Sequence, residues 1–375
     1  MRPLSAIACL LALSACGGAS RSSGQPDATA AAPVDAGGAA VPVDAGLDAG
    51  AQVAPPDAGS AAADAGAPVV DAGTLDAGTL VDAGTPADAG TITAAAQPTL
   101  GGCPMFPLSS DWNRDVSADP VDAHSGDYLA FMGSGSLKLH PDFGGQYGQP
   151  FVVVPGSQQR VTMTFLYSSQ SDPGPYPFPP DVPIQVDVDH HVTVLDSGDC
   201  ALYETYNTYA QGSGFHADSG ARFDLRSDAL RPDGWTSATA AGLPILPGLA
   251  RYDEAVEQGE IRHALAFVAG TTAHLYVAPA THSSGTSSAP WAPPMGLRVR
   301  LRADYDLSGF HGTSLVVLRA LRRYGMFITD TAGGDFWSLA GGQDSRWPLQ
   351  DLEQLKSVPV SAFEVVQIGT VHSGQ

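Results

Sequence analysis

The sequence has few basic residues, few cysteines and no apolar run long enough to cross a bilayer. Its 375 residues include 18 lysines and arginines against 39 aspartates and glutamates, which gives a formal net charge of −21 at pH 7. Proteins that bind nucleic acid present a positive surface, and anionic lipid headgroups repel an acidic one. The charge therefore argues against a nucleic-acid partner and against electrostatic docking on a membrane.

A short apolar run at the N-terminus has the features of an export signal. Arg2 precedes the apolar residues 6–13, a length that suits the core of a signal peptide but cannot span a membrane. The sequence Leu-Ser-Ala-Cys, ending at Cys16, follows at once. It resembles the lipobox of bacterial lipoproteins, in which the matching cysteine is lipidated and becomes the N-terminus after cleavage.

This resemblance implies a signal peptide over residues 1–15 and a lipid anchor at Cys16 that attaches the protein to a bacterial membrane. Gly17 follows the cysteine. The absence of Asp at that position implies sorting to the outer membrane, with the protein facing the periplasm or the cell surface.

Aromatic residues are absent from residues 16–100. This region consists mainly of Ala, Asp, Gly, Pro, Val and Thr, and the triplet Asp-Ala-Gly occurs nine times in it. A segment so poor in large apolar side chains cannot offset the entropy lost when its backbone is ordered. The composition predicts a disordered, acidic tether that connects the lipid to one folded domain over residues 101–375.

Two of the four cysteines remain for the folded domain, because Cys9 leaves with the signal peptide and Cys16 takes the lipid. An even pair in an oxidising compartment predicts one disulfide, between Cys103 and Cys200. Neither cysteine has the CxxC spacing of a zinc site. His190 and His191 cannot both ligate one ion from a regular strand, because adjacent side chains point to opposite faces. We therefore expect no metal.

Short strand signals recur through the folded domain and are separated by Gly and Pro. They cover residues 151–154, 161–167, 191–195, 201–206, 221–225, 261–268 and 273–277. Residues 190–206 should form a hairpin around the turn 197–199, with Cys200 just after the turn. Helical spacing occurs at residues 314–324 and, more briefly, at residues 351–356. The pattern predicts a mainly β fold: a single antiparallel β-sandwich, jelly-roll-like, with one or two short helices.

Residues 297–307 show the cleanest alternation of apolar and charged side chains. The apolar side should face the core, with Arg298, Arg300 and Arg302 on the opposite face. Such a charged face is usually solvated. The alternative is a row of guanidinium groups that holds an acidic glycan.

Residues 229–267 hold the densest collection of turn formers, charges and aromatic rings in the chain. Turn-forming residues place Arg231 and Trp235 in an ordered loop. Charged groups follow within the same stretch: Arg251, Asp253, Glu254, Glu260 and His263. These groups either meet in a site where a loop joins a sheet, or form ion pairs that hold the loop in place.

A second loop, residues 171–181, contains five prolines. Proline excludes both a helix and a central strand here, so the loop should be stiff and extended. Asp172, Tyr176 and Phe178 then form the rim of a binding site, for which a preformed loop loses little entropy. Alternatively, the aromatic rings fold back and cap an open end of the sandwich.

Several blocks of this domain support a family resemblance. They are SDPGPYPFP (171–179), ALRPDGWTSATAAG (229–242), LARYDE (249–254), GEIRHA (259–264), PMGLRVR (294–300) and YGM (324–326). Together they resemble a family of secreted bacterial proteins that is known only as uncharacterised, over most of residues 112–368. The resemblance implies a folded domain and brings no activity with it.

Known catalytic motifs are missing: the sequence has no Gly-rich phosphate loop, no GxSxG and no HExxH. We therefore expect no cofactor. Carboxylates, arginines and aromatic rings on an exported β scaffold remain, a combination that suits sugars. The sequence thus favours a monomer that binds or cleaves carbohydrate, with a polysaccharide as the partner.

Four functions stay open. A glycoside hydrolase needs two carboxyl groups, here Glu204 with Asp253, Glu254 or Glu260. A polysaccharide lyase would use His263 or His216 with a tyrosine as base and acid. A glycan-binding module, or a structural or adhesive envelope protein, needs neither set. The predicted catalytic residues are Glu204, Asp253, Glu254 and His263. The predicted substrate-binding residues are Asp172, Tyr176, Arg231, Trp235 and Arg251.

Overall fold

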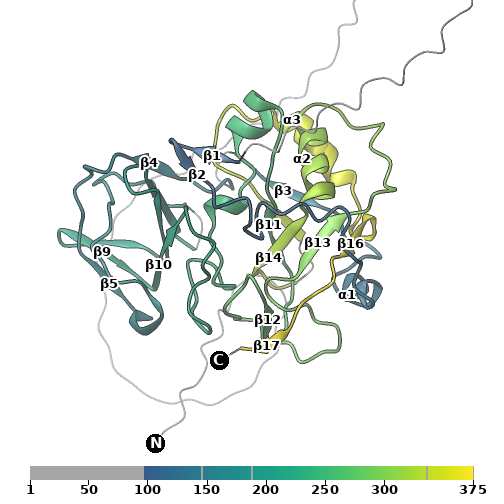
Figure 1. Cartoon of the computed structure of the whole chain (residues 1–375), viewed down its shortest axis with the longest axis horizontal. Coiled ribbons are helices and arrows are strands. Elements are labelled where there is room, and N and C mark those ends of the chain that lie inside the picture. Colours follow the sequence, from purple (N-terminus) through teal and green to yellow (C-terminus); the bar gives the residue numbers. More distant parts are fainter. Residues whose placement is uncertain (1–96, 145–146, 187–188, 335–336, 375) are drawn as a thin grey trace, which may run out of the picture. The chain divides into compact units, whose positions relative to one another are not determined.

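The structure is a computed structural model, and it describes residues 97–144, 147–186, 189–334 and 337–374 (Figure 1). The expected signal peptide, the lipidation site at Cys16 and almost all of the tether lie outside these residues. The described residues fall in one unit. Across them, no helix has both the length and the apolar character needed to cross a membrane.

A six-stranded mixed sheet forms the centre of the larger core. Its strands, in spatial order, are β16 (Phe363–Val365), β13 (Arg298–Leu301), β14 (Met326–Thr331), β11 (Leu265–Ala269), β15 (Trp337–Ala340) and β3 (His140–Asp142). Met326, Phe327 and Ile328 are buried in succession, so both faces of β14 are covered. Helix α2 (Gly312–Arg323) packs against β13 through its apolar residues, among them Val317, Leu318 and Leu321. The expected helix over residues 314–324 is confirmed.

A four-stranded sheet and a separate three-stranded sheet lie beside this core (Figure 1). The order of the four-stranded sheet is β10 (Ser219–Asp224), β7 (Ala201–Tyr206), β6 (Val192–Asp196) and β4 (Val152–Val154). The three-stranded sheet is β5 (Met163–Phe165), β9 (Gly214–Ala217) and β8 (Tyr209–Gln211). Two further pairs are β1 (Thr99–Leu100) with β2 (Cys103–Pro104), and β12 (Leu275–Val277) with β17 (Val371–Ser373). An aromatic cluster around Tyr176 and Phe178 fills this second core.

The mainly β character of the domain is confirmed, but its strands are not all antiparallel. Four pairings between named strands are parallel in the described part of the chain: β11–β14, β15–β3, β4–β6 and β5–β9. The expected antiparallel arrangement is wrong for these pairs, because parallel neighbours need long crossovers that short strand signals do not reveal. The sandwich packing itself stays a prediction. Helices are short, as expected: α1 (Ser125–Phe131), α3 (Leu349–Leu352) and the 3₁₀ turn Glu353–Ser357 accompany α2.

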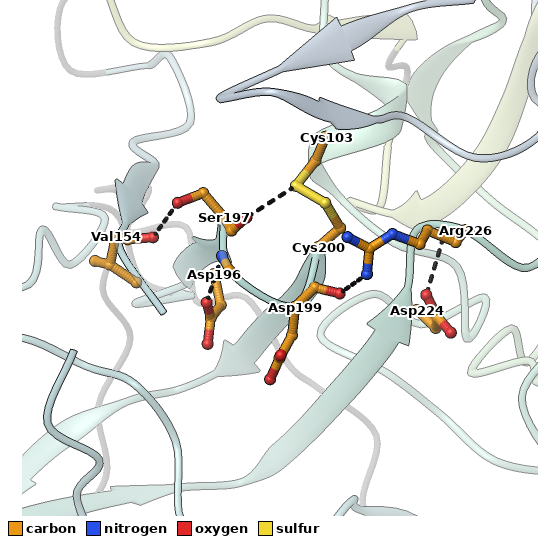
Figure 2. The surroundings of a disulfide bond; sticks show 9 residues. Cys103, Val154, Asp196, Ser197, Asp199, Cys200, Asp224 and Arg226 are labelled. Carbon is orange, nitrogen blue, oxygen red and sulfur yellow. Dashed lines mark hydrogen bonds between the residues drawn. A yellow bond between two sulfur atoms is a disulfide. The ribbon is translucent and has the colours of Figure 1, made fainter. Parts of the chain in front are cut away.

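The predicted disulfide is present (Figure 2). Cys103 and Cys200 are bonded across 97 residues, with 5.3 Å between their Cα atoms. Cys200 follows the turn of the β6–β7 hairpin, which the sequence also predicted. The turn is held on β4, because the hydroxyl of Ser197 donates to the carbonyl of Val154 at 2.9 Å. The disulfide therefore joins the first described strand pair to the four-stranded sheet.

The arginines of β13 differ from the expectation. The strand ends at Leu301, and Arg298 and Arg300 are buried, not solvated. Arg298 donates to the carbonyls of Asp111, at 2.9 Å, and of Tyr324, which follows the last turn of α2. Carbonyls at a helix end lack partners within the helix, so a guanidinium there is well satisfied. Burial still lowers the pKa of Arg298 to about 9.

Candidate functional site

A cavity of about 230 Å³ opens between two loops that are far apart in sequence, and we call it the Arg231 cavity. Its lining comes from residues 106 and 109–112, from Phe223, from residues 228–231, from residues 242–244 and from Pro279. The second loop belongs to the stretch 229–267 that the sequence singled out. The first loop was not predicted to take part.

The first wall is a loop held by one buried amide. Nδ2 of Asn113 donates to the carbonyls of Met105, Phe106 and Pro107, at 2.8, 3.1 and 3.0 Å. Phe106 has φ of 65°, a left-handed conformation that is uncommon for a bulky residue. Trp112 is buried and meets the ring of Phe327 edge-on at 5.1 Å. Asn113 and Trp112 together thus hold this loop in place.

The second wall is organised by Arg231. Its side chain is 4% exposed and forms an ion pair with Asp172 of the Pro-rich loop. It also donates to the carbonyls of Gln170 and Thr236 at 2.9 and 2.8 Å. The guanidinium lies 5.6 Å from the ring centre of Trp235, within the range of a cation–π contact. Three of the predicted substrate-binding residues are therefore brought together, although only Arg231 lines the cavity.

Tyr176 does not line the Arg231 cavity. Its ring has no exposed surface and packs on Phe178 and Tyr203, at 5.5 and 4.9 Å between ring centres. Its hydroxyl donates to the carbonyl of Asp172 at 2.9 Å. Burial raises the pKa of the Tyr176 phenol. The Pro-rich loop thus turns these rings inward, as the alternative interpretation of that loop expected.

Two carboxylates line the cavity, and neither was predicted from the sequence. Asp228 accepts a hydrogen bond of 2.9 Å from the hydroxyl of Ser109, which joins the two walls. Asp111 faces the same cavity and lies 3.5 Å from the guanidinium of Arg114. The available signal was weak, because the Ser-Ser-Asp-Trp segment is 117 residues from Asp228 and has no recognised motif spacing. The site therefore combines carboxylates, a hydroxyl and aromatic rings.

Glu204 lies elsewhere, inside the core. It has no exposed surface, and its two carboxylate oxygens accept hydrogen bonds from the backbone N–H groups of Leu246 and Ile245, at 2.9 and 2.8 Å. Burial raises the pKa of Glu204 to about 7, although the two hydrogen bonds oppose the change. In this position the carboxyl group holds the start of a 3₁₀ turn (Leu246–Gly248) against β7.

The other predicted catalytic residues form a separate buried network around a π-helix, Asp253–Gln258. Arg251 is 1% exposed and lies 2.7 Å from Glu254 and 3.1 Å from Asp253. His263 contacts the second oxygen of Glu254 at 3.1 Å. Burial would raise the pKa of Glu254, but the charges of His263 and Arg251 outweigh it and hold that pKa below its ordinary value. The network pins the loop, as the second interpretation of this stretch proposed.

The predicted catalytic residues do not line the Arg231 cavity. Glu204 bonds to one backbone segment, while Asp253, Glu254 and His263 belong to the Arg251 network. A shared cleft for all four stays a prediction. Among the described residues, no group of three or more His, Cys, Asp and Glu side chains is placed to hold a metal ion.

Comparisons of the chain with protein-family models, with curated proteins and with solved structures found no match.

Proposed function

We propose that the protein is a lipid-anchored lipoprotein of the bacterial envelope whose folded domain binds carbohydrate in the Arg231 cavity. The lipobox-like sequence at Cys16 and the acidic tether support the anchor. The Cys103–Cys200 disulfide is consistent with an oxidising compartment. A layered sandwich arrangement of the sheets is part of the same proposal.

The observation that carries the proposal is the lining of the cavity. Phe106 and Phe223 offer apolar ring surface, while Asp111, Asp228 and Ser109 offer oxygen atoms. Sugars present both kinds of surface, since their C–H groups pack on rings and their hydroxyls donate to carboxylates. The volume of about 230 Å³ is below that of sites for drug-sized ligands, so the cavity suits one small unit of a larger molecule.

Cleavage of a glycosidic bond is the second candidate function. It rests on Asp111 and Asp228 lining the same cavity, because carboxyl pairs perform this chemistry. Glu204 and Glu254 are less suited to it, since each is buried and already holds hydrogen-bonding or charged partners. We therefore favour binding, with hydrolysis as the alternative at this cavity.

The test is a binding assay on the whole mature chain. Peptidoglycan fragments, lipopolysaccharide core oligosaccharides, and neutral and uronic-acid oligosaccharides would be titrated by calorimetry. We expect at least one class to bind and Asp228→Asn to weaken that binding about tenfold, the effect of losing one charged hydrogen bond. Asp181→Asn, an exposed aspartate outside the lining, is the matched control. Equal affinity in Asp228→Asn and Asp181→Asn would contradict the proposal.

A further inference from the structure

Trp291 stands on a turn whose backbone suits a glycine. The backbone N–H of Ala292 donates to the carbonyl of Ala289 at 3.2 Å, which closes a four-residue turn. Pro290 takes the second position and Trp291 the third, with φ of 66°. A proline followed by a positive φ is the pattern of a type II turn, in which the third residue is normally Gly or Asn. A tryptophan there costs backbone strain.

Burial of the ring does not fully offset this strain, because Trp291 is 40% exposed. Residues held in a strained conformation at the surface are concentrated at ligand sites. The ring is fixed in place by two neighbours. It stacks on His124 with 4.3 Å between ring centres, and Tyr128 meets it edge-on at 5.8 Å. The turn therefore presents an immobilised aromatic surface.

One neighbour lies in α1 and the other directly before it, and both have polar groups close by. His124 precedes the first residue of α1 and Tyr128 lies one turn later, so both lie on the same side of the helix. Nδ1 of His124 lies 3.1 Å from the carboxylate of Asp127, which is half-exposed. Asp122 is also nearby and accepts a hydrogen bond from the backbone N–H of His124 at 2.8 Å. The carboxylates of Asp122 and Asp127 thus lie close to His124 as hydrogen-bond acceptors.

We propose that Trp291, His124 and Tyr128 form a second carbohydrate-binding surface, the Trp291 platform. A sugar ring packs its C–H face on the indole, and Asp127 accepts hydrogen bonds from its hydroxyls. The carboxylates disfavour an anionic membrane or nucleic acid as the occupant. The ligand class rests on the proposed glycan-binding function, whereas the location rests on separate observations.

A groove is lined by other residues of α1, next in sequence to His124 and Tyr128. It has a volume of about 640 Å³, within the range of ligand sites, and we call it the α1 cavity. Ser125, Gly126 and Leu129 of the same helix line it together with Arg302 and Glu364. Its walls combine charged and hydroxyl side chains with apolar ones, among them Val121 and Phe363.

The decisive variant is Trp291→Gly, because glycine fits the positive φ and removes the ring. We expect the variant to keep or exceed the wild-type melting temperature and to lose at least tenfold in affinity for the oligosaccharide that the whole mature chain binds in calorimetry. Trp291→Phe keeps a smaller ring and should retain part of the affinity. A purely structural tryptophan predicts the reverse, a lower melting temperature with unchanged affinity, and that result would overturn the platform.

A parallel titration of Asp228→Asn separates this inference from the proposed function. Loss of affinity in Asp228→Asn with none in Trp291→Gly would overturn the platform and leave the Arg231 cavity standing. Loss only in Trp291→Gly would support the platform and overturn the cavity. Binding to vesicles of phosphatidylethanolamine and phosphatidylglycerol is measured as well. Vesicle binding that depends on Trp291, without any oligosaccharide binding, would overturn a carbohydrate role for the platform.

Discussion

Glu204 on β7 accepts a hydrogen bond of 2.8 Å from the backbone N–H of Ile245, 41 residues later in the chain. The other oxygen of the same carboxyl group accepts from Leu246. One buried side chain thereby fixes the segment at Ile245 and Leu246 to the four-stranded sheet.

Glu204→Gln should lower the free energy of unfolding by about 1–3 kcal/mol. An amide has only one oxygen, so one of the two backbone N–H groups loses its acceptor in a site without exposed surface. Urea denaturation would measure the loss. Glu353→Gln is the control, because Glu353 is largely exposed and pairs only with Lys356. Equal stability of both variants would contradict the structural role of Glu204.

The stability of the wild-type protein should fall as the pH rises from about 4.5 to about 7. The pKa of Glu204 is raised from 4.5 to about 7 in the folded state, and that of Asp330, which burial also raises, from 3.8 to about 7. The folded state then binds more protons in this interval, so the contribution of each neutral carboxyl is complete below its unfolded pKa and lost by about pH 7. The slope is at most about 1.4 kcal/mol per pH unit for each group.

Urea unfolding at several pH values measures this slope, and Glu204→Gln should make it shallower. The lowered pKa of Glu254 changes stability in the opposite direction, because stability is lost as the pH falls through the folded-state pKa. This change takes place below pH 4.5, the ordinary pKa of a glutamate. Its window therefore lies outside the interval. Burial also lowers the pKa of His282 from 6.5, and this opposes the slope just below pH 6.5. A slope in Glu204→Gln equal to that of the wild type would contradict the prediction.

Glu254→Gln should cost about 3–5 kcal/mol, because it removes one member of a buried charge network and leaves Arg251 without its closest carboxylate. Glu257→Gln in the same π-helix is a matched control. Glu257 is exposed and pairs with Arg346 at the surface, so its loss should cost at most about 1 kcal/mol. Thermal unfolding of both variants checks the difference. Full stability of Glu254→Gln, together with a loss of glycan turnover, would restore Glu254 as a catalytic residue.

Removal of the disulfide by Cys103→Ser with Cys200→Ser should destabilise the domain by about 2–5 kcal/mol, because the bond closes a long loop in the unfolded chain. Denaturation of the oxidised and reduced wild-type protein provides an independent measurement. A double variant as stable as the wild type would show that the unfolded chain gains little freedom when this bond is absent.

Cys16→Ser should abolish lipid attachment and move the protein out of the membrane fraction, since no other anchor is predicted from the sequence. Mass spectrometry of the mature N-terminal peptide and cell fractionation test this outcome. The neighbouring Ser14→Ala is a useful control, because it keeps the cysteine. A Cys16→Ser protein that still carries lipid would refute the anchor.

Local features of the fold were predictable from the sequence. The β6–β7 hairpin, helix α2 and the disulfide follow from short-range turn signals, helical spacing and the count of cysteines. The parallel pairing of β11 with β14 was not predictable, because it joins segments about 60 residues apart and depends on the packing between them. The π-helix at Asp253–Gln258 was also missed, since its backbone is set by the buried contacts of Arg251 and Glu254.

The candidate site was predictable only in part. Arg231, Asp172 and Trp235 were expected to bind substrate, and the structure brings these three together. Asp111 and Asp228 were not identified, since an exposed aspartate looks the same in a sequence whether it lines a cavity or faces solvent. Arg298 was expected in water, and only the arrangement of the Asp111 and Tyr324 carbonyls explains its burial.

The bond between Cys103 and Cys200 also determines how the domain carries mechanical load. Tension applied to the chain before Thr99 reaches Cys103 after four residues and passes covalently to Cys200. Residues 104–199, which include β4, β5 and β6, lie in the closed loop between the two cysteines and bear none of this tension. A pull from the N-terminal side therefore first loads β1 and then, through the disulfide, β7 and the strands that follow. The loop can be extended by force only after the disulfide is reduced.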